Sequence, residues 1–508
     1  PDRLDAYTRQ HAAVWPEMLQ AIADAGRRNY SLFLREDGLL IGYYEVDDDA
    51  AAQAALERDP RTAAWEARMA DYFVASAGRP DQESRRLPEV FHLEDQLRAL
   101  SAPVSDSQHS TEDRKAKTMS TLLTPDVQAV LDRLKIEVPS WAYGNSGTRF
   151  KVFTTPGTPR DPFEKIADAA QVHRHTGLAP EVAIHIPWDL VDDYDALAGY
   201  AAEQGVGIGT VNSNTFQDDD YKFGGLTHED AVIRQKAIDH HLACIDVMDR
   251  TGSRDLKIWL ADGSNYPGQA DLRGRQDRLH DSLQKIYARL SGEQRLVLEY
   301  KFFEPAFYHT DVPDWGTSYA QVSALGERAM VCLDTGHHAP GTNIEFIVMQ
   351  LLRLGKLGSF DFNSRFYADD DLIVGAADPF QLFRILFEVV RGGGMDVDTP
   401  VAFMLDQCHN IEDKIPGQIR SVLNVQEMTA RALLVDHDAL RAAQIPGDVL
   451  TANAVFMDAF QTDVRPALAE WRESRGLPAD PMAAYAASGY REKIVAERVG
   501  GTQAGWGA

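Results

Sequence analysis

The sequence predicts an α/β fold: a (β/α)8 TIM barrel with a C-terminal helical extension, preceded by a ferredoxin-like α+β domain. Two observations predict the barrel. From residue 119 onward, eight short apolar runs with strand-like character alternate with helical segments. Each run ends in polar or ionisable side chains, and TIM barrels carry their active sites at the carboxyl ends of their strands. A doubly wound open sheet is the alternative, but it would not bring eight strand ends to one point.

Composition and charge exclude several classes of protein. At 508 residues the chain is too long for one core, and two or three domains are expected. The formal net charge of −26 argues against binding to nucleic acid or to an anionic membrane. The sequence contains no run of about 18 apolar residues, the length that could span a membrane. The 3 cysteines lie far apart in apolar patterns, which is typical of reduced thiols in a cytoplasmic protein.

The first 94 residues are expected to form the small α+β domain. Asp37-Gly38 is a strong hairpin-turn signal between two apolar runs, and Pro60 is typical of a helix start. The expected elements are, in order, a helix in 2–25, strands at 30–35 and 39–46, helices at 49–58 and 60–75, and a strand at 88–93. This is the order of a ferredoxin-like unit without its opening strand, which we expect to lie upstream of Pro1.

A composition shift marks the boundary between the two domains. Residues 101–118 are rich in Ser, Asp and Lys and have almost no large apolar side chain, which is typical of an exposed linker. We therefore expect a first domain at 1–94, a linker at 95–118, the barrel at 119–426, and a helical extension and tail at 427–508. The extension is expected to pack on the barrel or on a neighbouring subunit.

The expected barrel strands are short apolar runs. They lie at 137–143, 181–186, 206–211, 255–260, 296–300, 330–333, 358–362 and 400–405. Because the carboxyl ends of barrel strands converge on one mouth, the polar side chains that follow these runs are expected to lie together.

Four carboxylates follow four successive runs, namely Glu299, Asp334, Asp361 and Asp406. Carboxylates gathered at one point repel one another unless a cation lies between them. Hard oxygen ligands favour Mg²⁺ or Mn²⁺. A single aspartate at the end of a strand is more often a helix cap, so the prediction depends on the combination over four strands.

A second cation site is predicted beside the first. His337 lies three residues beyond Asp334, and Asp369 and Asp371 follow the seventh run. One imidazole among carboxylates favours Mn²⁺ or Co²⁺ over Ca²⁺. Two cations side by side can polarise neighbouring oxygens of a polyol. Lys301, two residues after the first of the four carboxylates, shares its strand face and is expected to point to the same place.

Residues 119–426 resemble bacterial L-rhamnose isomerases with broad aldose specificity, which are TIM barrels. The stretches that carry the resemblance are GNSGTRF at 144–150, HIPWD at 185–189, LADGSNYPGQ at 260–269, EYKFFEPAFY at 299–308, DTGHH at 334–338, FN at 362–363 and DDDL at 369–372. The resemblance implies interconversion of L-rhamnose and L-rhamnulose with Mn²⁺, two ions per barrel, and with Co²⁺ or Mg²⁺ as substitutes. We expect a homo-oligomer, either a dimer or a tetramer. We also expect its binding partner to be a small-molecule sugar substrate.

The resemblance also implies roles for single residues. It implies a first metal site of Glu299, Asp334, Asp361 and Asp406, and a second of Glu299, His337, Asp369 and Asp371. Lys301 would lie near the C1 oxygen of the substrate, and Lys301 and Asp371 are the catalytic candidates of the barrel. His185 and Trp188 would line the sugar. Some family members have His at the position of Asp361, and Asp is a competent ligand for a hard metal.

An aldose–ketose isomerisation moves a hydrogen between C1 and C2. Metals that bridge the two oxygens polarise the carbonyl and stabilise the alkoxide. No isolated carboxylate in the pattern is evidently free to act as a proton-transfer base. A metal-assisted hydride shift is therefore the first choice of mechanism, and a path through a cis-enediol is the second.

Residues 2–94 resemble L-rhamnose mutarotase, a small ferredoxin-like dimer. The stretches that carry this resemblance are DAYTRQH at 5–11, HAAVWP at 11–16, NYSLFL at 29–34, Trp65, and PEVFHL at 88–93. Mutarotation takes a proton from the anomeric hydroxyl and gives one to the ring oxygen, and a histidine with a pKa near 7 can serve both steps. We predict His11 as the acid and base, assisted by Tyr7 one turn before it, with Trp65 lining the sugar and no cofactor.

Other interpretations remain open at this point. The barrel could isomerise or epimerise another aldose, such as L-lyxose, L-mannose or D-allose, or it could bind sugar through a metal without turnover. The first 94 residues could be a dimerisation module without activity, with His11 and Tyr7 as ordinary helix packing.

Overall fold

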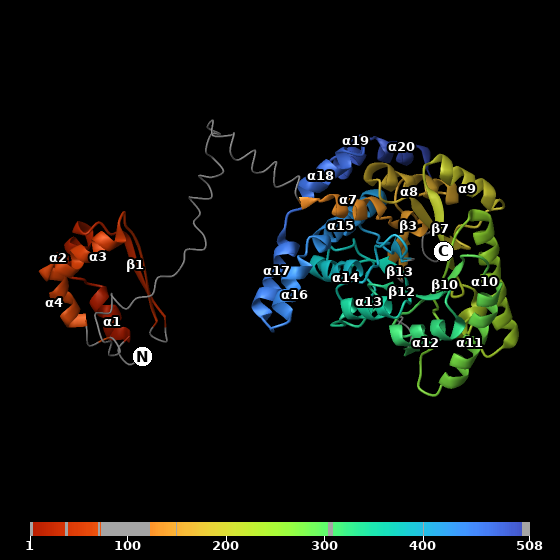
Figure 1. Ribbon diagram of the computed structural model, residues 1–508, viewed down its shortest axis with the longest axis horizontal. Coiled ribbons are helices and arrows are strands. Elements are labelled where there is room, and N and C mark those ends of the chain that lie inside the picture. The colour runs from red at the N-terminus through yellow and green to blue at the C-terminus, as the bar shows by residue number, and fades with distance from the viewer. Residues whose placement is uncertain are drawn as a thin grey trace. The chain divides into compact units, whose positions relative to one another are not determined.

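The computed structural model describes residues 4–35, 39–69, 72, 122–148, 150–302, 308–399 and 401–499 (Figure 1). The chain divides into two compact units, Pro1–Asp106 and Ser107–Ala508. None of the helices within these described ranges is long and apolar enough to cross a membrane.

The larger unit is built on a closed barrel of parallel strands, as the sequence predicts. Its strands are β3 (Glu137–Pro139), β6 (Glu181–Ile186), β7 (Gly207–Ser213), β8 (Asp255–Ile258), β10 (Arg295–Glu299), β12 (Ala329–Asp334), β13 (Leu357–Phe362) and β14 (Ala402–Leu405). They follow one another around the barrel in chain order, and β14 pairs with β3 to close it.

The strands read as nearly continuous apolar runs because both of their faces are covered. Every residue of β10 and of β12 is buried. The register aligns Glu299 with Cys332, and Asp334 with Asp361, on neighbouring strands. The carboxyl ends of β10, β12 and β13 therefore bring their acidic residues side by side.

Helices cover the outside of the barrel (Figure 1). α7 (Pro125–Arg133) precedes the first strand, and the helices that follow the strands are α8 (Pro162–Thr176), α9 (Tyr194–Glu203), α10 (Ala231–Thr251), α11 (Leu272–Arg289), α12 (Trp315–Leu325), α13 (Ile344–Arg353), α14 (Pro379–Arg391) and α15 (Lys414–Leu433). Aspartate N-caps fix where many of them begin: the carboxylate of Asp161, for example, accepts a hydrogen bond from the backbone N–H of Glu164.

The loops after the strands carry small additional elements. They include a hairpin of β4 (Ser146–Thr148) with β5 (Lys151–Phe153). They also include an antiparallel pair of β9 (Gly263–Ser264) and β11 (His309–Thr310), two strands from different loops. A 3-10 turn, η3 (Asp219–Phe223), lies between β7 and α10.

Two boundaries differ from the expected ones. The first strand ends at Pro139 instead of residue 143, and a 3-10 turn, η2 (Ser140–Tyr143), follows it. In this turn the Ser140 hydroxyl donates to Asp189, and the Trp141 indole donates to Asp406. These hydrogen bonds hold the turn where the apolar pattern alone suggested more strand. The eighth barrel helix, α15, runs past residue 427, where we expected the extension to begin.

The C-terminal extension is helical, as predicted. It contains α16 (His437–Gln444), α17 (Val449–Gln461), α18 (Arg465–Glu473), α19 (Pro481–Ala487) and α20 (Tyr490–Glu497). α17 and α19 pack on α15, and α19 also packs on α8. Arg498, just beyond α20, donates to Oδ2 of Asp168 on α8 at 2.7 Å. The extension therefore lies on the outside of the barrel.

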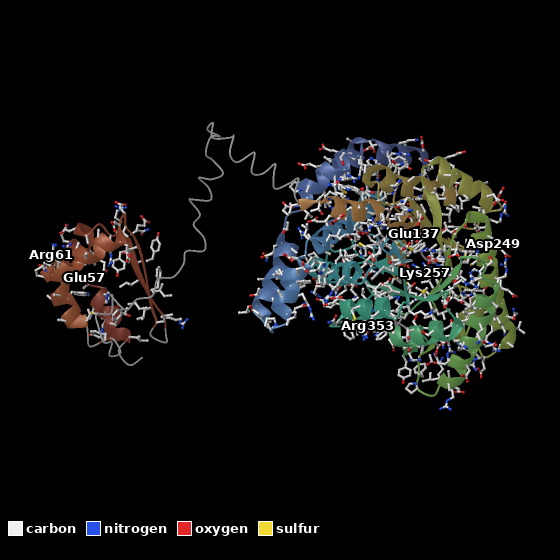
Figure 2. All side chains as sticks on the ribbon, in the orientation of Figure 1. Glu57, Arg61, Glu137, Asp249, Lys257 and Arg353 are labelled. Carbon is white, nitrogen blue, oxygen red and sulfur yellow. The ribbon has the colours of Figure 1, made fainter. Side chains whose placement is uncertain are left out.

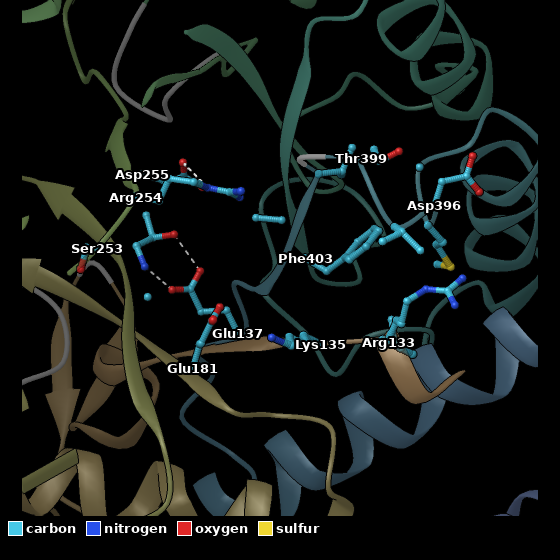
Figure 3. Close-up of a pocket in the computed structure, with 18 of the residues that line it drawn as sticks. Arg133, Lys135, Glu137, Glu181, Ser253, Arg254, Asp255, Asp396, Thr399 and Phe403 are labelled. Carbon is cyan, nitrogen blue, oxygen red and sulfur yellow. Dashed lines mark hydrogen bonds and ion pairs between the residues drawn. The ribbon is translucent and has the colours of Figure 1, made fainter. Parts of the chain in front are cut away.

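The amino ends of the barrel strands surround a cavity of about 630 Å³ (Figure 3). Glu137, Glu181 and Asp255, the first residues of their strands, line it. The Glu137 carboxylate accepts a hydrogen bond from the Thr210 hydroxyl at 2.7 Å, and burial raises the pKa of Glu137 to about 7. This cavity lies at the end of the barrel opposite the predicted site and is lined by none of its residues.

The smaller unit is an α+β arrangement, as predicted. Its described elements are α1 (Leu4–His11), α2 (Pro16–Asp24), β1 (Arg28–Leu34), β2 (Leu40–Glu45), α3 (Asp49–Arg58) and α4 (Pro60–Met69), with β1 and β2 antiparallel. The segment expected as one helix at 2–25 is two helices. Trp15 has a ψ of 136° because it precedes Pro16, and a residue before proline avoids the helical region. The expected strand at 88–93 and the linker at 95–118 lie outside the described residues.

Candidate active site at the barrel mouth

Four carboxylates meet at the carboxyl ends of the last four barrel strands. One oxygen each of Glu299, Asp334, Asp361 and Asp406 lies within 4.8 Å of the corresponding oxygens of the others. The first three side chains are buried and Asp406 is half-buried. The strand register produces this cluster, since it sets the ends of neighbouring strands side by side. The mouth thus brings together every member of the first predicted metal set.

The electrostatics of this cluster favour a cation. Burial, opposed by His337 and reinforced by the surrounding carboxylates, raises the pKa of Asp334 to about 7. Burial also raises the pKa of Asp361 to about 6, and that of Asp406 well above its ordinary value. A divalent cation between these groups would offset the repulsion that keeps them from ionising. The cluster is therefore chemically suited to a hard cation.

Asp334 has an oxygen to spare for such a cation. Its Oδ1 accepts hydrogen bonds from the Gly336 backbone N–H at 2.6 Å and from the Asn363 amide at 2.9 Å. Its Oδ2 is buried and has no hydrogen-bond partner among the residues that the structure describes. A buried carboxylate oxygen without a partner is costly, and a metal ion at this place would satisfy it.

His337 joins the cluster from the loop after β12. Its Nδ1 donates to the Tyr300 carbonyl at 3.0 Å, so its Nε2 is the nitrogen that can bind a metal. Nε2 lies 3.4 Å from Oδ2 of Asp369 and 3.8 Å from Oδ2 of Asp334. Burial lowers the pKa of His337, but the carboxylates of Asp334 and Asp369 outweigh burial and raise it well above its ordinary value. Glu299, Asp334 and His337 form a second group of possible ligands.

The second predicted metal set is gathered only in part. Asp369 lies beside His337, and its Oδ1 is a buried atom without a hydrogen-bond partner within the described ranges. Asp371 is buried at the same mouth, with a φ of +46°, but it belongs to none of the possible ligand groups found among the described residues. Burial and the charges of Asp369, Asp406 and Asp334 raise the pKa of Asp371 well above its ordinary value. Asp371 is therefore close enough for the charges of the cluster to raise its pKa, but it lies outside the groups of possible ligands.

Lys301 contacts the acidic loop directly. Its ammonium lies 2.8 Å from Oδ2 of Asp369 and 5.0 Å from the centre of the Trp259 ring. The side chain is held between an anion and an aromatic face, where it can offer a positive charge to an oxygen of a bound molecule.

His185 and Trp188 form an aromatic wall beside the carboxylates. Their rings stack with centroids 3.8 Å apart, and the Trp188 indole donates to Gln217 at 2.5 Å. The backbone N–H of His185 donates to Asp189 at 2.8 Å. Burial keeps the pKa of His185 well below its ordinary value, so its ring is neutral. A neutral imidazole and a flat ring are suited to hydroxyl groups and to the apolar face of a sugar.

Two residues at this mouth were missed by sequence reasoning. Lys257, on β8, lies within the larger unit (Figure 2). It is buried and contacts the Asp361 carboxylate. Trp141, in η2, donates to Oδ1 of Asp406 at 2.9 Å. The signal for the lysine was present, because a lysine within an apolar strand needs a buried anion. The apolar pattern contains no signal for the contact of Trp141, because it places this residue in a strand.

The smaller unit has its own polar cluster. Tyr7, His11 and Trp65 lie together, with ring centroids 4.2 Å apart for Tyr7 and His11 and 5.6 Å apart for His11 and Trp65. His11 Nδ1 donates to the Tyr7 carbonyl at 3.3 Å, which leaves Nε2 as the proton acceptor. Burial lowers the pKa of His11, so its ring is neutral at pH 7. Burial, and to a smaller extent the charge interaction with Tyr30, raises the pKa of Tyr7 to about 12.

Comparison with known proteins gives two family matches. Residues 1–93 match the family model of L-rhamnose mutarotase, and residues 191–498 match that of L-rhamnose isomerase. The chain is 43% identical over 379 residues to a probable sugar isomerase of Mesorhizobium japonicum, a match that covers 73% of this chain and 88% of that protein. It is 27% identical over 234 residues to an L-rhamnose isomerase of Rhodopirellula baltica, covering 44% of this chain and 52% of that one. An L-rhamnose mutarotase of Pectobacterium atrosepticum is 34% identical over 97 residues, which are 18% of this chain and 89% of that protein.

Proposed function

Because this chain belongs to the L-rhamnose isomerase family and also carries an L-rhamnose mutarotase region, we propose that it performs both reactions. The motifs of the sequence predicted both regions. The barrel converts L-rhamnose to L-rhamnulose, and the smaller unit exchanges the anomers of L-rhamnose. The observation that carries the first part is the cluster of Glu299, Asp334, Asp361 and Asp406 at the mouth, with His337 beside it.

The carboxylate cluster at the mouth fits one divalent cation, and His337 with Asp369 beside it provides part of a second site. We propose Mn²⁺ at both sites, with Co²⁺ or Mg²⁺ as substitutes. The first would be held by Glu299, Asp334, Asp361 and Asp406, and the second by Glu299, His337, Asp369 and Asp371. When bound, such cations polarise neighbouring carbonyl and hydroxyl oxygens and lower the cost of negative charge on them. The imidazole in the second set favours Mn²⁺ or Co²⁺ over Ca²⁺.

The other side chains of the mouth bind and orient the sugar. Lys301 offers its ammonium to the C1 oxygen while Asp369 holds the other side of that ammonium at 2.8 Å. The stacked rings of His185 and Trp188 line one side of the sugar. Because both rings are buried or half-buried, they also exclude water from the reacting carbons.

We propose that, in the open-chain sugar, the hydrogen moves from C2 to C1 as a hydride. The C2 hydroxyl loses its proton and the C1 oxygen gains one, so that the carbonyl passes from C1 to C2. The carboxylates of the mouth are members of the proposed ligand sets, so none of them is assigned to remove a carbon-bound proton. Proton transfer through a cis-enediol is the second choice. Turnover in D₂O separates the two: substantial solvent deuterium at C1 of the ketose product would exclude the hydride shift.

The proposal for the smaller unit rests on His11. Its neutral ring can take the proton of the anomeric hydroxyl at Nε2 and return one to the ring oxygen. Tyr7 and Trp65 pack against this ring and would form one side of the sugar pocket. No metal is assigned to this step.

One NMR experiment tests both parts. L-Rhamnose is followed for anomer exchange and for ketose formation, with and without EDTA. We expect EDTA to stop ketose formation and Mn²⁺ to restore it, while anomer exchange continues throughout. Ketose formation that persists in fully metal-free protein would refute the metal-dependent part.

The sugar itself is tested separately, because the relative from Mesorhizobium japonicum is named only as a probable sugar isomerase. The values of kcat/KM are compared for L-rhamnose, L-lyxose, L-mannose and D-allose. We expect the highest value for L-rhamnose. A higher value for another aldose would make the barrel an isomerase of that sugar.

A further inference from the structure

Lys257 is a buried cation inside the barrel that the proposed reaction does not use (Figure 2). It lies on β8, which neighbours β10 and its Glu299 in the barrel. The strands that end in Asp334 and Asp361, β12 and β13, follow β10. Its ammonium contacts Oδ1 of Asp361 on β13, and Sδ of Met404 on β14 lies 3.6 Å away. The side chain therefore reaches across the barrel interior to the underside of the carboxylate cluster.

A third group of possible metal ligands lies in the same place. Ligand atoms of Glu299, Cys332 and Asp361 lie within 4.8 Å of one another. This deep group shares Glu299 and Asp361 with the cluster at the mouth, and it exists because the register aligns Glu299 with Cys332. The ammonium of Lys257 interacts electrostatically with all three members of the group. The deep group thus already has a cation, supplied by the chain itself.

We propose that Lys257 is a positioning residue that serves as a built-in counter-ion of the metal centre. It holds one oxygen of Asp361, confines divalent cations to the outer part of the cluster, and lowers the affinity of the mouth for them. The inference rests on the proposed function to the extent that the mouth must bind a divalent cation.

The physical argument concerns the balance of charge in a buried space. Without a counter-ion, carboxylates gathered in the barrel would repel one another strongly, so Lys257 stabilises the metal-free fold. Once a divalent cation is bound, the same ammonium is a like charge at close range in a poorly screened environment. Lys257 therefore stabilises the metal-free protein more than the metal-bound protein, and by linkage this weakens metal binding.

The experiment measures Mn²⁺ affinity by calorimetry and thermal unfolding in EDTA and in Mn²⁺, using the full chain. We expect Lys257→Met to bind Mn²⁺ at least about tenfold more tightly than the unmodified protein. We also expect its melting temperature to fall further in EDTA than in Mn²⁺. Lys257→Arg keeps the positive charge and should keep an affinity close to that of the unmodified protein.

Arg295→Met is the matched control. It breaks another buried ion pair, in which Arg295 Nη2 lies 2.6 Å from Oδ2 of Asp255 at the amino end of β10. We expect this variant to lose the same melting temperature in EDTA and in Mn²⁺ and to bind Mn²⁺ as the unmodified protein does. Lys257→Gln, which keeps a hydrogen-bond donor for Asp361, replaces Lys257→Met if that variant does not fold, with the same expected gain in affinity.

The outcomes separate the two proposals. An unmodified protein that binds no Mn²⁺ contradicts the proposed metal centre, and with it the premise of this inference. The other case is an unmodified protein that binds Mn²⁺. If the neutral variants at position 257 then bind Mn²⁺ with unchanged affinity and lose the same melting temperature in EDTA and in Mn²⁺, Lys257 is only a structural residue.

Discussion

The ammonium of Lys301 lies 2.8 Å from Oδ2 of Asp369. Burial alone would raise the pKa of Asp369, but the charges of His337 and Lys301 overcome it and hold the pKa below its ordinary value. Asp369 thus stays ionised more readily than the aspartates of the mouth whose pKa values are raised, which are Asp334, Asp361, Asp371 and Asp406. It holds Lys301 in a fixed place while its other oxygen, Oδ1, remains without a hydrogen-bond partner in the described part of the chain.

Replacing Lys301 with methionine should therefore impair isomerisation selectively. We expect kcat/KM for ketose formation to fall by about 10²–10³, because a donor aimed at a reacting oxygen is lost. Anomer exchange should not change. Lys285→Met, which removes an exposed ion pair with Asp281 on α11, is the matched control and should keep full activity. Ketose formation at the unmodified rate in Lys301→Met would remove Lys301 from the reaction.

The carboxylate cluster predicts an unusual dependence of stability on pH. The pKa values of Asp334 and Asp361 are raised to about 7 and about 6, above their values in an unfolded chain. Between about pH 4 and 7 the folded, metal-free protein then binds more protons than the unfolded chain does. The free energy of unfolding contributed by these groups is present at low pH and is lost as pH rises through their folded pKa values.

We therefore expect that EDTA-treated protein loses this contribution to stability between pH 5.5 and pH 8, and that Mn²⁺ restores it most strongly at pH 8. Because Mn²⁺ must displace protons from the cluster, its affinity should rise with pH by about tenfold per pH unit for each proton displaced. Calorimetry at several pH values measures this slope. An affinity that does not vary between pH 5.5 and pH 8 contradicts the raised pKa values.

The barrel could be predicted from the sequence because its signal is repeated. Each strand is an apolar run short enough to be a strand, and helical periodicity follows it. The element ends were less predictable, since they depend on single interactions. The first strand stops at Pro139 because Ser140 and Trp141 find partners in Asp189 and Asp406, which are distant in sequence.

The candidate site could be predicted where its residues stand at strand ends, since the topology alone gathers those ends. The prediction that Glu299, Asp334 and Asp361 lie together required only that their strands form a barrel. Lys257 needed more, because its partner is 104 residues away and the two meet only across the closed interior. Periodicity shows that a side chain faces inward, but it does not show what the side chain contacts there.

The stack of His185 on Trp188, with centroids 3.8 Å apart, predicts a binding defect. Trp188→Ala removes the ring that covers the sugar and should raise KM for ketose formation by about tenfold, with a smaller effect on kcat. Trp188→Phe keeps an aromatic face and should restore most of the affinity. Steady-state kinetics on both variants measure the effect. A fall in kcat without a change in KM would mean that Trp188 positions reacting atoms instead of holding the sugar.

His11 decides whether the smaller unit is an enzyme or a dimerisation module. His11→Ala should lower the rate of anomer exchange by about 10²–10⁴, the usual contribution of a general acid and base, and leave ketose formation from L-rhamnose intact at saturating substrate. Because burial lowers the pKa of His11, the loss of exchange by the unmodified protein on acidification should have its midpoint below the ordinary pKa of histidine. Arg9→Ala, an exposed change on the same helix, is the control. Saturation-transfer NMR measures exchange directly, and unchanged exchange in His11→Ala would leave the smaller unit with a role in assembly alone.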